Sequence, residues 1–281
     1  MNGGKNISGP DDLERIRDAA RQIRRQAIRM SHRAGAAHLG SALSCADILA
    51  AAYYGALNVD PENPSHPGRD RFILSKGHAV AALYAALGHR AFFPLELLDA
   101  FNTDGAALAE HPLPSCAPGV EFAAGSLGHG LSVGLGMAAA AKLASDRPPY
   151  RVYILLSDGE CNEGSVWESA LFAPAYGLDN VMAIVDYNRW QATDRSENVL
   201  ALKPLKDKWA AFGWSVYEAD GHDAAGLVPL MRNLPDGSGK PAAVIAHTVK
   251  GKGVSFMEDD NNWHYRIPSE EETEAALREL V

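Results

Sequence analysis

The sequence predicts an α/β fold built on a doubly wound parallel sheet with helices on both faces. Residues 152–156 and 181–185 are continuously apolar, which is typical of strands covered on both sides. Residues 163–176 between them have the pattern of a helix, so we expect the two strands to run parallel. Further strands are predicted at residues 72–74, 214–217 and 243–248, so strands and helices alternate along the chain.

Helices are predicted near both ends of the chain. Apolar residues recur at helical spacing over residues 11–33, which predicts an amphipathic helix. A second, alanine-rich helix is expected over residues 44–57, before prolines open a loop over residues 58–70. Ser269 and Glu272 have the spacing of a capping box, so the last dozen residues are expected to form a helix.

A dense glycine cluster follows the helix expected over residues 79–87, and it leads into a helix that ends near Leu143. Glycines at a helix start let the backbone approach a ligand, whereas Gly130 and Gly134, four residues apart, favour close packing against another helix. The cluster lacks the strand and acidic residue that accompany a dinucleotide-binding fingerprint. Its members are Gly125, Gly128, Gly130, Gly134 and Gly136.

Size and charge restrict the class of protein. The chain has 281 residues, of which 47% are hydrophobic, so residues 1–281 are expected to form a single domain. A formal net charge of −9 argues against nucleic acid as a partner, because phosphate backbones select basic surfaces.

Cysteines and apolar runs indicate the compartment. Cys45, Cys116 and Cys161 are three scattered cysteines without metal-ligand spacing, which favours free, buried thiols in the cytoplasm. Residues 1–6 lack the apolar core of a signal peptide, and the apolar run 131–143 is too short to span a bilayer. We therefore expect no membrane partner.

Hard oxygen ligands follow both central strands. Asp158 comes directly after the first apolar run and Asn188 follows the second, thirty positions later. The carboxyl ends of parallel strands meet at one edge of a sheet, so these side chains are expected to lie close together. A carboxylate and an amide oxygen suit Mg²⁺ or Ca²⁺, which often keep a ligand's phosphates as further donors. The pair predicts a metal–diphosphate site.

The surrounding residues resemble a known family. Ser157-Asp158-Gly159-Glu160, continued to Asn188, resembles the thiamine diphosphate motif. Further strings resemble transketolase in the same order, from about residue 15 to residue 268: His38-Leu39-Gly40-Ser41, Asp70 to Ala79, Glu110-His111-Pro112, Gly119-Val120-Glu121, Gly125 to Gly128, and Lys250 to Ser255. The resemblance implies a thiamine diphosphate-binding domain of the PP type, the amino-terminal subunit of a split transketolase.

The resemblance also implies roles for residues. His38 and His111 would face the sugar substrate, and imidazoles suit proton transfer near neutrality. His78 and His264 would line the diphosphate as well, together with the Gly159 amide. The remaining implied contacts are Gly125, Leu127, Glu160 and Asn188 to thiamine diphosphate, and Asp158, Asn188 and the carbonyl of Trp190 to Mg²⁺ or Ca²⁺.

The implied reaction transfers a two-carbon glycolaldehyde unit from a ketose, expected to be a sugar phosphate, to an aldose. The thiamine diphosphate carries the difficult chemistry. Nothing in the chain resembles the pyrimidine-binding domain that activates the cofactor, so we expect an α2β2 assembly with a separate carboxyl-terminal subunit. Glu163 and Glu168 would lie near that subunit, unless they belong to an ordinary helix surface.

Several positions depart from the family pattern. Ser157 replaces a glycine, Ala37 replaces a glycine before His38, and His129 replaces a glutamine. After Asn188, Trp190 stands where the family commonly has an apolar residue, and Thr193 and Asp194 stand where it has an Asp-Gly pair. The altered loop is compatible with an unusual donor, such as a sulfonated ketose. Two alternatives stay open: another thiamine diphosphate enzyme component, related to 1-deoxyxylulose-phosphate synthase or a 2-oxo acid dehydrogenase, and a noncatalytic subunit with the same fold.

Overall fold

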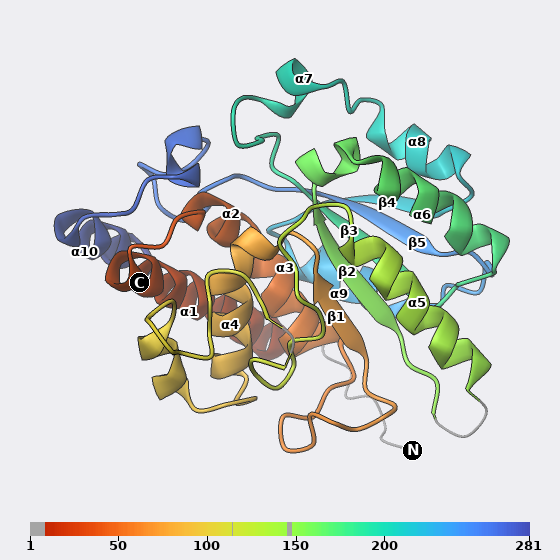
Figure 1. Cartoon of the computed structure of the whole chain (residues 1–281), viewed down its shortest axis with the longest axis horizontal. Coiled ribbons are helices and arrows are strands. Elements are labelled where there is room, and N and C mark those ends of the chain that lie inside the picture. Colours follow the sequence, from red (N-terminus) through yellow and green to blue (C-terminus); the bar gives the residue numbers. More distant parts are fainter. Residues whose placement is uncertain (1–8, 114, 145–147) are drawn as a thin grey trace.

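Five parallel strands form the centre of the computed structural model, which describes residues 9–113, 115–144 and 148–281 (Figure 1). Their order across the sheet is β1-β2-β3-β5-β4, and every neighbouring pair is parallel. The predicted fold class is confirmed. The strands are β1 (Arg71–Leu74), β2 (Val152–Ser157), β3 (Val181–Tyr187), β4 (Ser215–Asp220) and β5 (Ala242–His247).

Alternate strand residues enter two separate cores, because successive side chains point to opposite faces of a sheet. On β2, Tyr153 and Leu155 belong to one core, whereas Ile154 and Leu156 belong to the other. All side chains of β2 and β3 are buried. This explains why both strands are continuously apolar apart from their last residues.

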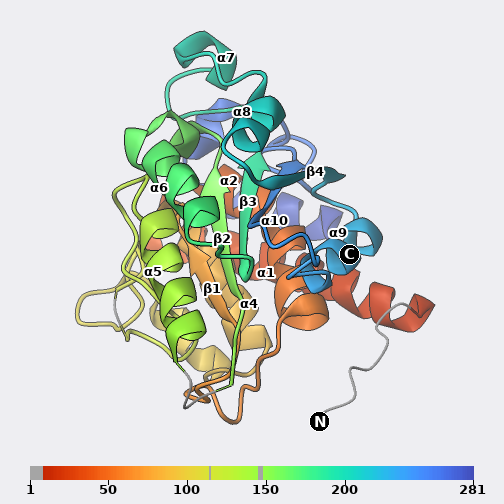
Figure 2. The ribbon, with the colours of Figure 1, turned by 90° about the vertical axis from the view of Figure 1, so that its right-hand side faces the viewer.

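Helices cover both faces of the sheet (Figure 2). The face of Ile154 packs against α5 (Gly130–Leu143), α6 (Gly164–Ala175) and α8 (Leu205–Ala211). The face of Leu155 packs against α1 (Pro10–Ala34), α4 (Val80–His89) and α9 (Ala224–Arg232). The short α8 and α9 were not predicted, and Pro229 lies inside α9.

The helix predicted over residues 44–57 differs in the structure. Helix formation begins earlier, at α2 (Leu39–Ser44), and is interrupted at Cys45, whose φ of −98° and ψ of 5° are not helical. The Ser44 hydroxyl donates to the Ser41 carbonyl, a bond that competes with regular helix geometry. The path continues as α3 (Ala46–Ala50) and the π-helix η1 (Ala51–Ala56).

The remaining elements are one helix at the end of the chain and several short helices. The predicted capping box is confirmed, because Ser269 and Glu272 bond reciprocally at the start of α10 (Glu270–Glu279). In the described part of the chain no helix is long and apolar enough to cross a membrane. Residues 1–6, interpreted as lacking a signal peptide, lie outside the described residues. The other short helices are η2 (Gly77–Ala79), η3 (Leu95–Ala100), η4 (Gly159–Asn162), α7 (Ser196–Val199) and η5 (Asn261–His264).

Candidate active site

The two predicted metal ligands lie at one edge of the sheet. Ser157 pairs with Asp186 in the register of β2 and β3, so Asp158 and Asn188 both follow the carboxyl ends of neighbouring strands. A cleft of about 590 Å³ opens at this edge. It is lined by His38, Ser41, Lys76, His78, His111, Gly125, Leu127, Ser157, Gly159, Asn162, Glu163, Asn188, Trp190, Gln191, Ala192, Val199, Leu200 and His264.

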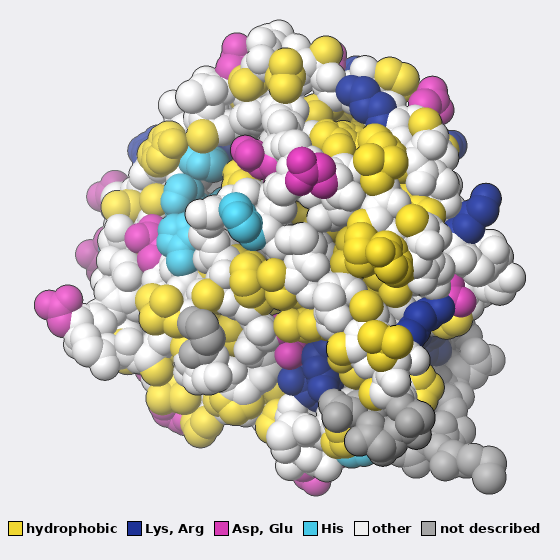
Figure 3. Space-filling view, turned by 45° about the vertical axis from the view of Figure 1, so that its right-hand side comes forward, with side chains coloured by type: hydrophobic (Ala, Val, Ile, Leu, Met, Phe, Trp, Pro, Cys, Tyr) yellow, Lys and Arg dark blue, Asp and Glu magenta, His cyan; other side chains and the backbone are white. Residues whose placement is uncertain are grey.

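The four predicted histidines come from four segments and gather in this cleft. The ring centroid of His38 lies 4.8 Å from that of His264, 5.3 Å from that of His78 and 6.1 Å from that of His111. The His38 amide donates to the His264 carbonyl at 2.8 Å, and His38 has a positive φ of 67°. Figure 3 shows histidine side chains gathered on one side of the molecule.

Burial keeps three of these imidazoles neutral. It lowers the pKa of His38, lowers that of His78 well below its ordinary value, and lowers that of His264 to about 3. The charge of Lys250 contributes to the low pKa of His264. Neutral imidazoles can each donate one hydrogen bond and accept another, which suits a site that handles hydroxyl groups.

Lys250 fixes the tautomer of His264. Its ammonium lies 3.1 Å from His264 Nδ1 and donates to Asn261 Oδ1 at 2.6 Å. The ammonium has only donors, so Nδ1 accepts and Nε2 carries the proton. Burial, followed by the charge of Lys76, lowers the pKa of Lys250 to about 8. The family resemblance included Lys250, but its contact with His264 could not be predicted.

A buried ion pair lies beneath the cleft. Lys76 and Asp186 are both fully buried and bond to each other, and Lys76 also donates to the Ser41 carbonyl at 3.0 Å. Asp186 further accepts hydrogen bonds from Ser44 and Thr248. The signal in the sequence was Asp186, a polar residue near the end of an apolar strand. The sequence patterns alone did not assign its ion pair with Lys76.

Asp158 is a buried carboxylate without an ion pair among the described residues. It accepts only from the Ser196 hydroxyl at 2.8 Å and the Gly159 amide at 2.8 Å. Burial raises the pKa of Asp158 to about 6. A cation would offset this desolvation, so the residue fits a metal ligand. In the described ranges no cluster of three or more His, Cys, Asp and Glu side chains could hold a metal ion.

The other two predicted ligands leave oxygens available. Asn188 Oδ1 accepts from the Trp190 amide at 3.0 Å, and its Nδ2 donates toward Ser44 and Asp186. No donor in the described part of the chain reaches the Trp190 carbonyl. A free carbonyl beside an amide oxygen is a donor set that Mg²⁺ and Ca²⁺ accept.

Unpaired polar atoms also point to a polar ligand. His38 Nδ1, Asn162 Oδ1 and Gln191 Nε2 are buried without a hydrogen-bond partner, and all three residues line the cleft. Buried polar groups are ordinarily paired. A diphosphate and a sugar would supply the missing donors and acceptors, so the cleft fits such ligands.

Glu160, predicted to contact the cofactor, turns its side chain into the protein. This carboxylate is fully buried and does not line the cleft. It accepts from the Ser75 hydroxyl, from the Gly128 amide at 2.7 Å and from the Ser157 amide at 3.2 Å. Because its oxygens are engaged inside the protein, Glu160 holds the segments that line the cleft.

The glycine cluster divides as predicted, with one difference. Gly125 lines the cleft, and a Cβ atom there would lie 3.7 Å from His111. A Cβ atom on Gly134 would lie 2.6 Å from Ile154, and one on Gly130 would lie 2.3 Å from the Ser75 hydroxyl. Both glycines therefore allow close packing, but against the sheet and the segment after β1 rather than against another helix.

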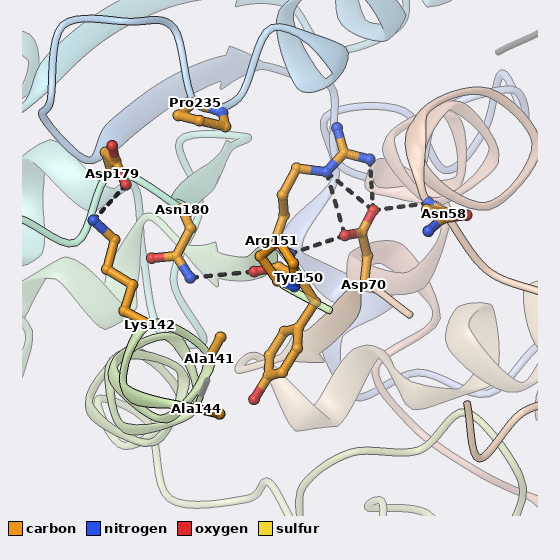
Figure 4. Close-up of a pocket in the computed structure, with 11 residues that line it drawn as sticks. Asn58, Asp70, Ala141, Lys142, Ala144, Tyr150, Arg151, Asp179, Asn180 and Pro235 are labelled. Carbon is orange, nitrogen blue, oxygen red and sulfur yellow. Dashed lines mark hydrogen bonds and ion pairs between the residues drawn. The ribbon is translucent and has the colours of Figure 1, made fainter. Parts of the chain in front are cut away.

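A second cavity of about 520 Å³ lies at the opposite edge of the sheet, near the amino ends of β2 and β3 (Figure 4). Its charged side chains are already paired: Arg151 with Asp70 at 2.5 Å and Lys142 with Asp179 at 2.6 Å. None of the predicted site residues lines it. The candidate site is therefore the cleft at the carboxyl edge.

The three cysteines are free, as predicted; Cys45 and Cys161 are buried and Cys116 is partly buried. Glu163 lines the cleft, and Glu168 lines a groove between α5 and α6. Ser157 uses its hydroxyl to accept from the Glu160 amide at 3.1 Å, which accounts for a serine at this position. His129 is exposed and outside the cleft.

The chain is an α/β domain with a cleft at the carboxyl edge of a parallel sheet. A model of the transketolase thiamine diphosphate binding domain matches residues 16–280, so the chain belongs to the transketolase family. This membership confirms the predicted family and the enzyme class, a transketolase-type transferase.

Two relatives of similar length are named as transketolase subunits. One subunit of an apulose-4-phosphate transketolase from Phocaeicola vulgatus is 41% identical, over 95% of this chain and 94% of that protein. One subunit of a 6-deoxy-6-sulfo-D-fructose transketolase from Clostridium sp. strain MSTE9 is 40% identical, over 94% of this chain and 96% of that protein. The chain therefore has the length of these subunits.

Full-length transketolases are similar over less than half of their length. A transketolase from Leishmania mexicana superposes with a TM-score of 0.86 and 27% identity, over 94% of this chain and 41% of that one. A transketolase from Pongo abelii is 36% identical over 42% of its own length. These relatives give no support to the two alternative classes of thiamine diphosphate protein.

Proposed function

We propose that residues 1–281 form a single PP-type domain, the diphosphate-binding subunit of a split transketolase. It would transfer a two-carbon glycolaldehyde unit from a ketose to an aldose. The observation that carries the proposal is the convergence of four histidines and Asn188 on one cleft, with Asp158 buried between the lining residues Ser157 and Gly159. The family match supports the same interpretation.

The residues of the cleft have complementary tasks in this proposal. Asp158, Asn188 and the Trp190 carbonyl would hold Mg²⁺, or Ca²⁺ in its place. The Gly159 amide and the imidazoles of His78 and His264 would donate to the diphosphate, and Lys250 would offset part of its charge. Gly125 and Leu127 would contact the rings of thiamine diphosphate. When bound, the cofactor supplies the electron sink for breaking and forming the carbon–carbon bond.

The substrate would occupy the side of the cleft formed by His38 and His111. Each imidazole can accept a proton from a sugar hydroxyl or return one. The Glu110 carboxylate accepts from the Ala37 amide at 3.1 Å, and this bond holds the backbone directly before His38. We propose a ketose that carries a phosphate or a sulfonate, in keeping with the substrates in the names of the two subunit relatives.

A partner subunit would complete the site. Beside the cleft, hydrophobic side chains gather on the surface over α5 and α6 (Figure 3). Leu143, Leu171 and Tyr176 are 85%, 59% and 66% exposed, and a groove of about 360 Å³ runs between the two helices. Exposed apolar surface of this kind is typical of interfaces. We propose that a carboxyl-terminal subunit covers it in an α2β2 assembly, in the cytoplasm.

Calorimetry tests the proposed site. With magnesium, thiamine diphosphate and the partner subunit present, Asp158→Ala should abolish binding of both metal and cofactor, because Asp158 would hold the cation that offsets the diphosphate charge. Asp99→Ala removes an exposed carboxylate outside the cleft and is the matched control. Unchanged cofactor affinity in Asp158→Ala would remove this edge of the sheet from the proposal.

A further inference from the structure

The loop after β3 carries two of the proposed metal ligands and returns on itself. Trp190 and Arg195 form an isolated antiparallel bridge, and the Gln191 amide donates to the Asp194 carbonyl at 2.9 Å. At the far end of the loop, the Ser196 hydroxyl donates to Asp158. The conformation of residues 188–196 therefore determines where the Trp190 carbonyl lies relative to Asp158.

One carboxylate outside this loop holds it. Asp259 accepts from both terminal nitrogens of Arg195, each at 2.6 Å, and from the Trp190 indole nitrogen at 2.8 Å. The Arg195 guanidinium carbon lies 3.7 Å from the centroid of the Trp190 ring. A single exposed ion pair contributes little, but a bidentate bond combined with stacking restricts both side chains to one geometry. We call Trp190, Arg195 and Asp259 the Asp259 clamp.

The segment that carries Asp259 also carries part of the diphosphate side of the cleft. The Asp259 amide donates to the Lys250 carbonyl at 2.8 Å. Two residues further on, the Asn261 side chain donates to the Ala192 carbonyl at 3.1 Å and accepts from Lys250. Lys250 in turn contacts His264. The clamp therefore joins the loop of the proposed metal ligands to the segment of His264.

We propose that Asp259 is a positioning residue that acts through Trp190 and Arg195 to hold the Trp190 carbonyl where the metal requires it. This inference rests on the proposed function, because it assumes a metal at Asp158 and Asn188. It also gives a reason for the departure at position 190: the indole nitrogen supplies the donor that an aliphatic side chain lacks.

The test uses the full chain assembled with its partner subunit, with Mg²⁺ and thiamine diphosphate as probes. Three variants change the clamp. Asp259→Asn removes the charge, and Arg195→Lys removes the planar guanidinium. Trp190→Phe, at a residue that also lines the cleft, removes the indole donor but keeps a ring. Asp99→Asn breaks a comparably exposed ion pair with Arg33 and is the control. Two readouts are the Mg²⁺ concentration for half-maximal cofactor binding and the melting temperature without ligand.

We expect Asp259→Asn and Arg195→Lys each to raise the half-maximal Mg²⁺ concentration about tenfold, as changes in groups that orient metal ligands commonly do. The double variant should raise the half-maximal Mg²⁺ concentration little further, because both changes break the same clamp. Trp190→Phe should have a smaller effect in the same direction. In the wild-type protein, metal binding should change the tryptophan fluorescence, and Trp190→Phe should remove most of that change.

The outcomes separate the two levels of the proposal. If Asp259→Asn needs the same Mg²⁺ concentration as the wild type for half-maximal cofactor binding, the role of the clamp is overturned and the proposed function stays intact. A lower melting temperature without any change in the Mg²⁺ requirement would overturn it as well, since the clamp would then be only structural. Wild-type protein that binds no thiamine diphosphate with Mg²⁺ would contradict the proposed function itself.

Discussion

His264 links the chemistry of the cleft to the stability of the protein. It is buried, its Nδ1 faces a lysine, and the pKa of its imidazole falls from an ordinary 6.5 to about 3. The unfolded chain therefore binds a proton below about pH 6.5 that the folded chain rejects. The free energy of unfolding should therefore decrease as the pH is lowered from about 6.5 to about 3.

Urea unfolding of the purified chain at pH 7 and pH 5 checks this expectation. From His264 alone, the free energy of unfolding should decrease by about 2 kcal/mol between these values, with His38 and His78 adding to the loss. His264→Gln should show a smaller decrease than the wild type. An equal decrease in both proteins would show that His264 is not the responsible group.

His38 and His111 are expected to act on the substrate rather than on the cofactor. His38→Ala or His111→Ala should lower ketol transfer about 100-fold, the usual contribution of a proton-transfer group, while leaving thiamine diphosphate affinity nearly unchanged. Parallel activity and calorimetry measurements on the assembled enzyme separate the two effects. A loss of cofactor binding as complete as that expected for Asp158→Ala would reverse the assignment.

At the scale of elements, Glu160 joins three segments that are distant in sequence. Its carboxylate bonds to Ser75 after β1, to Gly128 before α5 and to Ser157 at the end of β2. Each of these segments contributes residues to the cleft. The shape of the cofactor site therefore depends on a side chain that does not reach it.

Glu160→Gln tests this dependence, because the amide keeps the size of the side chain but loses one acceptor. We expect thiamine diphosphate to bind about tenfold more weakly, in line with changes to groups that support a site from behind. Glu96→Gln, at an exposed position, is the control. Normal cofactor affinity in a folded Glu160→Gln protein would contradict the role of Glu160.

The elements that could be predicted from sequence are those with a strong pattern. β2 and β3 are buried on both faces and hence continuously apolar, and Ser269 and Glu272 cap α10 by a local pair of bonds. The hydrogen bond from Ser44 to Asp186 could not be predicted, since it joins residues 142 positions apart. The buried position of the Glu160 side chain could not be predicted either, because its bonds to Ser75 and Gly128 join segments that are distant in sequence.

At the scale of the whole molecule, family motifs predicted which residues lie near one another. The structure adds the side-chain contacts that connect their segments. Asp158, Asn188 and the four histidines are recognisable because each lies in a short string of the transketolase pattern. The Asp259 clamp and the contact between Lys250 and His264 bring together side chains from separate loops, so no local pattern indicates them. Long-range contacts between side chains were therefore beyond what sequence patterns could predict.

The central claim is that this chain is one half of an active site. The most direct measurement is ketol transfer from a ketose phosphate to an aldose with Mg²⁺ and thiamine diphosphate, assayed before and after addition of a chain that carries a pyrimidine-binding domain. We predict no turnover by this chain alone and full turnover once the partner is added. Full turnover without the partner would contradict the claim.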